Sequence, residues 1–255
     1  MIKRKTAREI ELMRCAGVIA AAARQTAGQM VTGGATTQSI DKKVRDFILS
    51  QGAVPAFLGY NGFPANICVS VNEQVIHGIP SSRKLLHGDI VSIDIGATKN
   101  GYIGDCAASF IAGGGSSESE RLINVTRECF FKGLEFARVG YRVSDISGAI
   151  QQHAEANGYS VVREYIGHGV GSKMHESPEV PNYIEIPRKK ADPRLLPGMT
   201  LAVEPMVNEG KAAIKILEDR WTVVTVDGKN SAHYENTILI TDGEPEILTV
   251  CEGVP

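Results

Sequence analysis

The stretch IVSIDIGATKNGYIGDCAASF, residues 90–110, decides the fold because it predicts a β-hairpin that carries two acids within its strands. Asn100-Gly101 lies between two apolar runs, and this dipeptide is a strong signal for a two-residue turn, because both turn positions require positive φ. Such a turn pairs Gly96 with Asp105. Asp94 then shares a sheet face with Asp105, roughly 7–8 Å away along the diagonal.

This placement of two acids depends on the register of the hairpin. A three-residue turn would put the two carboxylates on opposite faces of the sheet. On one half-buried face, two negative charges are costly unless a positive group joins them. A bound metal ion is the simplest group that meets this need.

Composition places the chain among ordinary soluble globular proteins. It has 255 residues, of which 43% are hydrophobic and 22% are charged, with a net charge of −2. The length suits one domain or two closely joined halves. The net charge excludes a general attraction to nucleic acid or to an anionic membrane. The basic start MIKRKTAR predicts a solvated terminus, and a weak ribosome or RNA contact stays open as an alternative.

Cysteine usage and hydropathy address the compartment. The five cysteines are scattered, and no pair has the CxxC spacing of a zinc or redox motif. This pattern argues against a disulfide framework and favours a reducing, cytoplasmic location. No apolar run is long enough to span a bilayer, and Thr6-x-x-Glu9 predicts a capping box at the start of an amphipathic helix.

An internal repeat organises the chain. Helices are expected at about 6–30, 37–51, 118–138 and 144–157. LLHGDIVSID (85–94) aligns with LLPGMTLAVE (195–204), and both reach an acid at the tenth residue. IGDCAASFI aligns with HYENTILI. We therefore expect a single domain made of two helix-helix-sheet halves, about 6–112 and 118–250, related by a pseudo-twofold axis, with the site where they meet.

Four strand acids occupy matching positions of this repeat: Asp94, Asp105, Glu204 and Glu235. A single acid in a strand more often marks an edge or a satisfied core group, but four equivalent acids argue for a shared site. His168 lies between glycines in IGHGVGSKMHE, which lets other groups approach its ring. Together the five side chains form an oxygen-rich set. Such a set suits Mn²⁺, Fe²⁺, Co²⁺ or Mg²⁺ better than a thiolate-type zinc site, and it is large enough for two ions.

Five stretches spread along the chain resemble those of the type I methionine aminopeptidases, which belong to the pita-bread metallopeptidase family. They are NGFPANICVSVNEQVIHGIP, IVSIDIGATKNGYIGDCA, IGHGVGSKMHESPEVPNY, PGMTLAVEPMV and YENTILIT. The resemblance spans about residues 6–249. It implies an α+β pita-bread fold around a central antiparallel sheet. It also implies a hydrolase that removes the initiator methionine from nascent proteins and peptides, with a preference for a small second residue.

The resemblance also implies roles for individual residues. The metal ligands fall on Asp94, Asp105, His168, Glu204 and Glu235. Among them, Asp105 and Glu235 bridge two divalent ions. Cobalt, manganese and iron are the expected metals, with zinc or nickel as further options. A hydroxide that bridges the ions attacks the scissile carbonyl. Three catalytic residues are implied. His77 contacts the substrate backbone, His175 stabilises the oxyanion, and Glu204 shuttles a proton.

A pocket for the methionine side chain is implied by the same resemblance. It is lined by Tyr60, Phe63, Cys68 and Trp221, with Phe57 and Met174 nearby. An apolar and polarizable lining suits a thioether. The chain departs from the family pattern at three positions. Phe57 and Met174 put the shape of the pocket in question, and Cys106 puts in question one hydrogen bond beside the metal.

The implied partners are the N-termini of nascent chains, together with a transient ribosome contact. No nucleic-acid cofactor and no membrane are expected, and the protein is expected to be a monomer. Two other functions fit the same fold: an Xaa-Pro dipeptidase or aminopeptidase, and a binding protein that has lost catalysis. The first class usually carries an extra N-terminal domain, for which this chain has no room. The second class loses ligands, whereas all five ligand positions are filled here.

Overall fold

The computed structural model describes residues 2–184 and 192–251. Its helices are α1 (Ala7–Gln29), α2 (Thr37–Ser50), the 3₁₀ turn η1 (Tyr60–Gly62), α3 (Ser117–Leu134) and α4 (Val143–Ala156). Its strands are β1 (Val54–Pro55), β2 (Cys68–Val71), β3 (Gln74–Ile76), β4 (Ile90–Lys99), β5 (Tyr102–Ile111), β6 (Ser160–Val161), β7 (Gly167–Gly169), β8 (Glu176–Val180), β9 (Thr200–Val203), β10 (Met206–Asn208), β11 (Ile214–Ile216), β12 (Val223–Thr225), β13 (Ser231–His233), β14 (Glu235–Leu239) and β15 (Glu246–Ile247). All four predicted helices are therefore present, within a few residues of their expected ends.

The hairpin of β4 and β5 has the register that the sequence predicts. Asn100 and Gly101 form the turn with φ of 51° and 79°, and Gly96 pairs with Asp105. The side chains of β4 and β5 therefore alternate between the two faces of the sheet as expected. This confirms that Asp94 and Asp105 share a face.

The main sheet joins strands from both halves of the sequence. Its strand order is β1-β4-β5-β14-β9-β7-β8, with β2 added to β4 and β15 added to β14, and these pairings are antiparallel. The junction between β5 and β14 has only two paired positions, Glu235 with Ala107 and Asn236 with Cys106. We call this junction the seam, because the N-terminal and C-terminal parts of the sheet meet there.

Helix α1 packs against β4 and β5, and small residues allow it to come close. A Cβ atom added at Gly104 of β5 would lie 2.5 Å from the backbone of Gly17 in α1, so the two elements touch through their backbones. Thr6 and Glu9 cap the start of the helix reciprocally, which confirms the predicted capping box. The position of α1 relative to β5 is thereby fixed.

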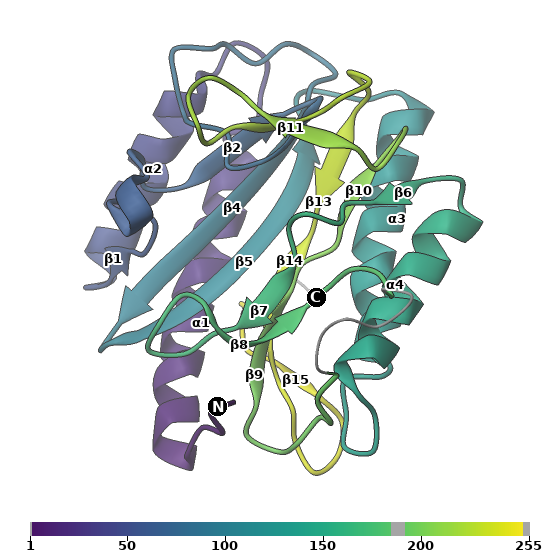
Figure 1. The fold of residues 1–255 in the computed structure, drawn as a ribbon. Coiled ribbons are helices and arrows are strands. Elements are labelled where there is room, and N and C mark those ends of the chain that lie inside the picture. The colour runs from purple at the N-terminus through teal and green to yellow at the C-terminus, as the bar shows by residue number, and fades with distance from the viewer. Residues whose placement is uncertain (1, 185–191, 252–255) are drawn as a thin grey trace.

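Two cores fill the space between helices and sheet. One lies between β4, β5 and the pair α1 and α2, and the other lies beneath α3 and α4. Figure 1 shows α1 and α2 behind β4 and β5, with α3 and α4 on the side of β10 and β13. One face of the main sheet is thus buried by helices, which leaves its other face for the site.

Two expectations about the chain as a whole have different outcomes. All five cysteines are free thiols, as predicted. The basic start is not simply solvated: Lys5 is buried, and its Nζ lies 2.7 Å from an Oε2 of Glu176. Its backbone N–H also donates to the carbonyl oxygen of Gly198, which ties the segment to the body of the protein. Among the described helices, none combines the length and the apolar character needed to cross a bilayer.

Candidate metal centre and substrate cavity

The five predicted ligands come from five neighbouring strands of the main sheet. Asp94 lies in β4 and Asp105 in β5, while Glu235 begins β14 and Glu204 directly follows β9. His168 lies in β7 and pairs with Ala202 of β9. The ligands therefore lie on both sides of the seam, three on its C-terminal side and two on its N-terminal side.

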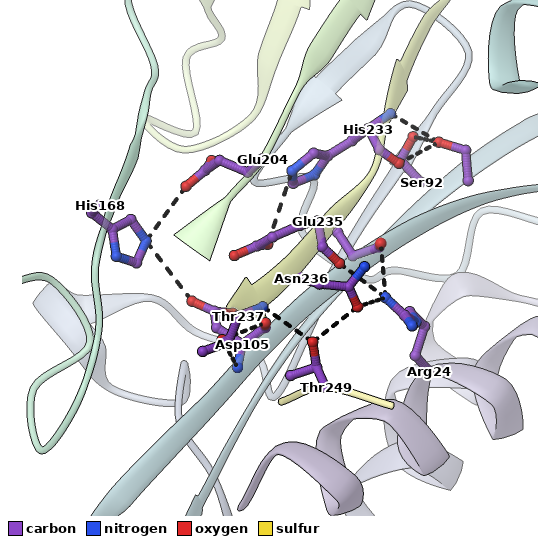
Figure 2. Close-up of polar contacts among 12 residues, drawn as sticks. Arg24, Ser92, Asp105, His168, Glu204, His233, Glu235, Asn236, Thr237 and Thr249 are labelled. Atoms are coloured by element: carbon purple, nitrogen blue, oxygen red, sulfur yellow. Dashed lines mark hydrogen bonds and ion pairs between the residues drawn. The ribbon is translucent and has the colours of Figure 1, made fainter. Parts of the chain in front are cut away.

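His168 faces the carboxylates with one ring nitrogen. Its Nε2 lies 3.4 Å from Oε1 of Glu204 and 3.9 Å from Oδ2 of Asp105 (Figure 2). Its Nδ1 lies 2.9 Å from the carbonyl oxygen of Gly169, which can only accept, so Nδ1 carries the proton. Burial lowers the pKa of His168 to about 4, with a contribution from nearby His175. The imidazole is thus neutral, and its Nε2 lone pair points at the acids.

The carboxylates are buried and incompletely hydrogen-bonded. Within residues 2–184 and 192–251, no hydrogen-bond partner is found for Oδ1 of Asp94, Oδ1 of Asp105 or Oε1 of Glu235. Burial raises the pKa of Asp105 to about 7. Burial also raises the pKa values of Asp94, Glu204 and Glu235, and the neighbouring charge of Asp105 adds to each. Such a group of acids stays ionised only if a cation offsets their repulsion.

This donor set fits divalent cations. Ligand atoms of Asp105, His168 and Glu235 all lie within 4.8 Å of one another. Carboxylate oxygens with one imidazole suit hard or borderline divalent ions, and the unpaired oxygens are free to accept them. The imidazole also has the orienting Nδ1–H contact that ligating histidines normally have. The residues present therefore match a divalent metal centre.

A cavity of about 160 Å³ opens beside these acids. The thirteen site residues predicted from the sequence all line it: Phe57, Tyr60, Phe63, Cys68, His77, Asp94, Asp105, His168, Met174, His175, Glu204, Trp221 and Glu235. It is also lined by residues that sequence reasoning missed: Asn61, Ile76, Tyr165 and Ile166. The ligands and the apolar pocket are thus brought into a single space.

Two histidines flank the carboxylates within the cavity. Nδ1 of His175 lies 2.7 Å from the hydroxyl of Tyr60, and its ring centroid lies 4.2 Å from that of His168. His77 has a left-handed backbone with φ of 57°, and its ring meets Tyr165 edge to face at 5.4 Å. Burial lowers the pKa of both histidines, to about 4 for His77. Both are therefore neutral near pH 7 and can each donate one N–H.

The apolar side of the cavity is built by aromatic and sulfur-containing side chains. Phe63 and Trp221 meet edge to face with ring centroids 5.1 Å apart. Phe57 and Met174 close over Gly96, where an added Cβ would lie 2.7 Å from Cε1 of Phe57 and 2.9 Å from Cε of Met174. Glycine at this position of β4 therefore lets both side chains reach the pocket.

Two further residues near the metal strands have informative positions. Cys106, where a hydrogen bond beside the metal was in question, instead packs into the hydrophobic core with α1 and α2. His233 received no role from the sequence, yet its Nε2 is buried 4.0 Å from Oε2 of Glu235. Ile76 directly precedes the predicted site residue His77, whereas no local pattern marks Tyr165, which reaches the cavity through tertiary contacts such as the edge-to-face contact with His77.

Comparison with known proteins shows which family the sequence matches and which solved structures share the fold. Residues 11–242 match metallopeptidase family M24. The methionine aminopeptidase of Clostridium acetobutylicum is 52% identical over 253 residues, which cover 99% of this chain and 100% of the relative. The crystal structure of methionine aminopeptidase from Thermotoga maritima superposes with a TM-score of 0.94 at 43% identity, over 98% of this chain and 99% of that one.

A more distant likeness bears on the fold alone. Prolidase from Pyrococcus furiosus superposes with a TM-score of 0.79 at 24% identity, and the match covers 98% of this chain but 66% of that chain. The shared architecture is the pita-bread fold, which confirms the fold class expected from the sequence.

Proposed function

The chain belongs to metallopeptidase family M24, and from that membership we propose that it removes the initiator methionine from the N-termini of nascent proteins and peptides. It is an aminopeptidase of the methionine-removing kind, a metal-dependent hydrolase. One observation carries the proposal: four buried carboxylates and one imidazole share a cavity with an apolar, sulfur-containing pocket.

The metal centre of the proposal uses two divalent ions, with cobalt, manganese or iron as the preferred metals and zinc or nickel as alternatives. Asp94, Asp105, His168, Glu204 and Glu235 would hold them, with Asp105 and Glu235 shared between the two. When bound, divalent ions lower the pKa of a water molecule towards neutrality and polarise a carbonyl group. The unpaired oxygens of Asp94, Asp105 and Glu235 support this assignment.

The chain's own residues supply orientation and proton handling. If the Tyr60 hydroxyl donates to Nδ1 of His175, the proton of that imidazole lies on Nε2, where it can donate to the oxygen of the scissile carbonyl. His77, held in place by Tyr165, is placed to contact the substrate backbone. Glu204 lines the cavity beside the other acids, where a carboxylate oxygen can accept a proton and pass it to the leaving amine.

Selectivity for methionine rests on the apolar side of the cavity. A thioether is unbranched and polarizable, so it packs well against aromatic rings and sulfur. The side chains proposed to contact it are Phe57, Tyr60, Phe63, Cys68, Met174 and Trp221. The preference for a small second residue is proposed by analogy with the family.

We place this activity in the cytoplasm, with the protein acting as a monomer and meeting the ribosome transiently. The five free thiols support a reducing compartment.

The deciding experiment measures metal-dependent release of the first residue from Met-Ala-Ser and from Ala-Pro peptides. We expect turnover of Met-Ala-Ser only, after Mn²⁺ or Co²⁺ is added to metal-free protein. Turnover of Ala-Pro alone would indicate an Xaa-Pro peptidase instead. No hydrolysis of either peptide with any of the five metals would leave only a binding function.

A further inference from the structure

The seam between β5 and β14 is held largely by side chains rather than by backbone pairing. Next to the two paired positions, the side chain of Thr237 makes the hydrogen bonds to β5 that a backbone pair would otherwise make. The N–H of Asp105 donates to Oγ1 of Thr237 at 3.1 Å, and that hydroxyl donates to the carbonyl oxygen of Asp105 at 2.9 Å. One hydroxyl therefore satisfies both backbone groups of a proposed bridging ligand.

A second side chain holds the seam from the helical side. Arg24 reaches from α1, and its Nη1 donates to the carbonyl oxygen of Glu235 at 2.9 Å and to Oδ1 of Asn236 at 3.0 Å. The same nitrogen lies 3.3 Å from the carbonyl oxygen of Ala107 on β5. Figure 2 shows this guanidinium on the opposite side of the strands from His168.

The two ends of the seam are connected through one relay. Oγ1 of Thr249 donates to the same Oδ1 of Asn236 that Arg24 contacts, at 2.9 Å, and it accepts the N–H of Thr237 at 3.1 Å. The path thus runs from Arg24 through Asn236 and Thr249 to Thr237, and then to the backbone of Asp105. Because α1 touches β5 backbone to backbone, the base of Arg24 is itself fixed.

We propose that Arg24 is a positioning residue for the metal centre, which clamps β5 and β14 at the separation at which Asp105 and Glu235 can share a cation. The inference rests on the proposed metal-dependent function. The carboxylates of Asp105 and Glu235 belong to different strands, and only two backbone pairs join these strands. Without Arg24, only these two backbone pairs and the Thr237 hydroxyl would join the strands at this point, so the seam can widen beside Glu235 and the ligand atoms can move apart. Groups that orient metal ligands in this way typically change affinity by 10–100-fold.

The test is Mn²⁺ binding to metal-free Arg24→Met protein, measured by isothermal titration calorimetry. Methionine keeps the length of the side chain and removes its donors. We expect an affinity for Mn²⁺ that is weaker by about tenfold or more. Activity on Met-Ala-Ser at limiting Mn²⁺ should fall accordingly and should recover in part when Mn²⁺ is saturating.

Arg127→Met is the matched control. Arg24 and Arg127 both line a cavity of about 470 Å³ on the helical side of the sheet. The guanidinium of Arg127 lies over the ring of Phe131 and, within the described part of the chain, has no hydrogen bond to the seam. The affinity of this variant for Mn²⁺ should equal that of the wild type. If the two variants weaken Mn²⁺ binding equally, the clamp is refuted and a general charge effect replaces it.

Chemical rescue separates positioning from a merely structural role. The cavity gives small cations access to the place of the missing guanidinium, so N-ethylguanidinium should restore Mn²⁺ affinity to Arg24→Ala and leave the wild type unchanged. Absence of rescue, together with an affinity of Arg24→Met within twofold of the wild type, overturns the proposal. If Arg24→Met does not fold, Arg24→Leu, which also removes the donors, decides in its place, and wild-type affinity for Mn²⁺ in that variant refutes the clamp. Wild-type protein that binds no Mn²⁺ would overturn the proposed function as well, which distinguishes the two failures.

Discussion

The metal centre and the apolar pocket share one cavity, but the chain builds them in different ways. The proposed ligands lie in or directly beside strands of one continuous sheet. The pocket walls come mostly from connections: Tyr60 lies in η1, Trp221 precedes β12, and Met174 lies in the turn between β7 and β8. Side chains on strands are held more precisely than side chains on loops. The difference suggests that the reaction chemistry is fixed in the scaffold, whereas substrate choice can be changed locally.

The largest effect on activity should come from replacing a proposed metal ligand that lies on a strand of the sheet. Asp105→Asn removes a proposed shared ligand from β5, and kcat on Met-Ala-Ser should fall by more than about 10²-fold, beyond what groups around the ligands typically contribute. The unfolding temperature of the metal-free variant should be no lower than that of the metal-free wild type, because a neutral amide relieves repulsion among buried acids. Full activity in a metal-replete assay would refute the assigned role. Circular dichroism during heating checks the fold.

A smaller effect is expected where a residue contacts the substrate rather than the metal. His175→Ala should lower kcat by roughly 10²–10³-fold if the imidazole stabilises the oxyanion. Tyr60→Phe, which removes only the hydroxyl next to Nδ1, should lower kcat less and leave Mn²⁺ affinity unchanged. Steady-state kinetics measure both variants. A change confined to KM in His175→Ala would indicate a binding role instead.

Changing a pocket wall should alter selectivity and not chemistry. Met174→Ala enlarges the apolar end beside Gly96, and kcat/KM for Met-Ala-Ser should fall by about tenfold, which is typical of lost contacts in an apolar pocket. Phe-Ala-Ser should become a relatively better substrate. Mn²⁺ affinity serves as the internal control. A loss of metal binding in this variant would show that the pocket residues and the metal ligands are not independent.

The smallest effect lies outside both regions and concerns stability alone. Lys3 and the Thr6 cap lower the pKa of Glu9 to about 2, from an ordinary value near 4.5. The ionised carboxylate therefore stabilises the fold above pH 4.5, and this contribution is lost as the pH falls towards 2. Glu9→Gln can keep the capping hydrogen bonds, so at pH 7 it should lower the free energy of unfolding by less than about 1 kcal/mol.

Urea denaturation of wild type and Glu9→Gln at pH 7 and at pH 3 measures this difference. It should be larger at pH 7 than at pH 3. An equal difference at the two pH values would mean that the charge of Glu9 does not contribute.

Local patterns in the sequence carried much of the fold and the ligand set. Asn100-Gly101 decided the register of the central hairpin, and that register put Asp94 and Asp105 on one face. The contributions that could not be predicted depend on long-range contacts: Tyr165 in the cavity, Lys5 buried against Glu176, and Arg24 across the seam. An arginine in a helix is ordinarily a solvated residue, and nothing in its neighbours along the chain indicates that it contacts β14. Only the packing of α1 on β5 gives it a role.

The seam also has a consequence for biosynthesis. It joins Asp105 to Thr237, which are 132 residues apart in the chain, so it can form only after most of the polypeptide has left the ribosome. A nascent fragment that ends after the first hairpin would carry two of the five proposed ligands, and the edge of β5 that faces β14 would have no partner strand. An enzyme that trims the first residue of other newborn chains thus becomes competent only late in its own synthesis.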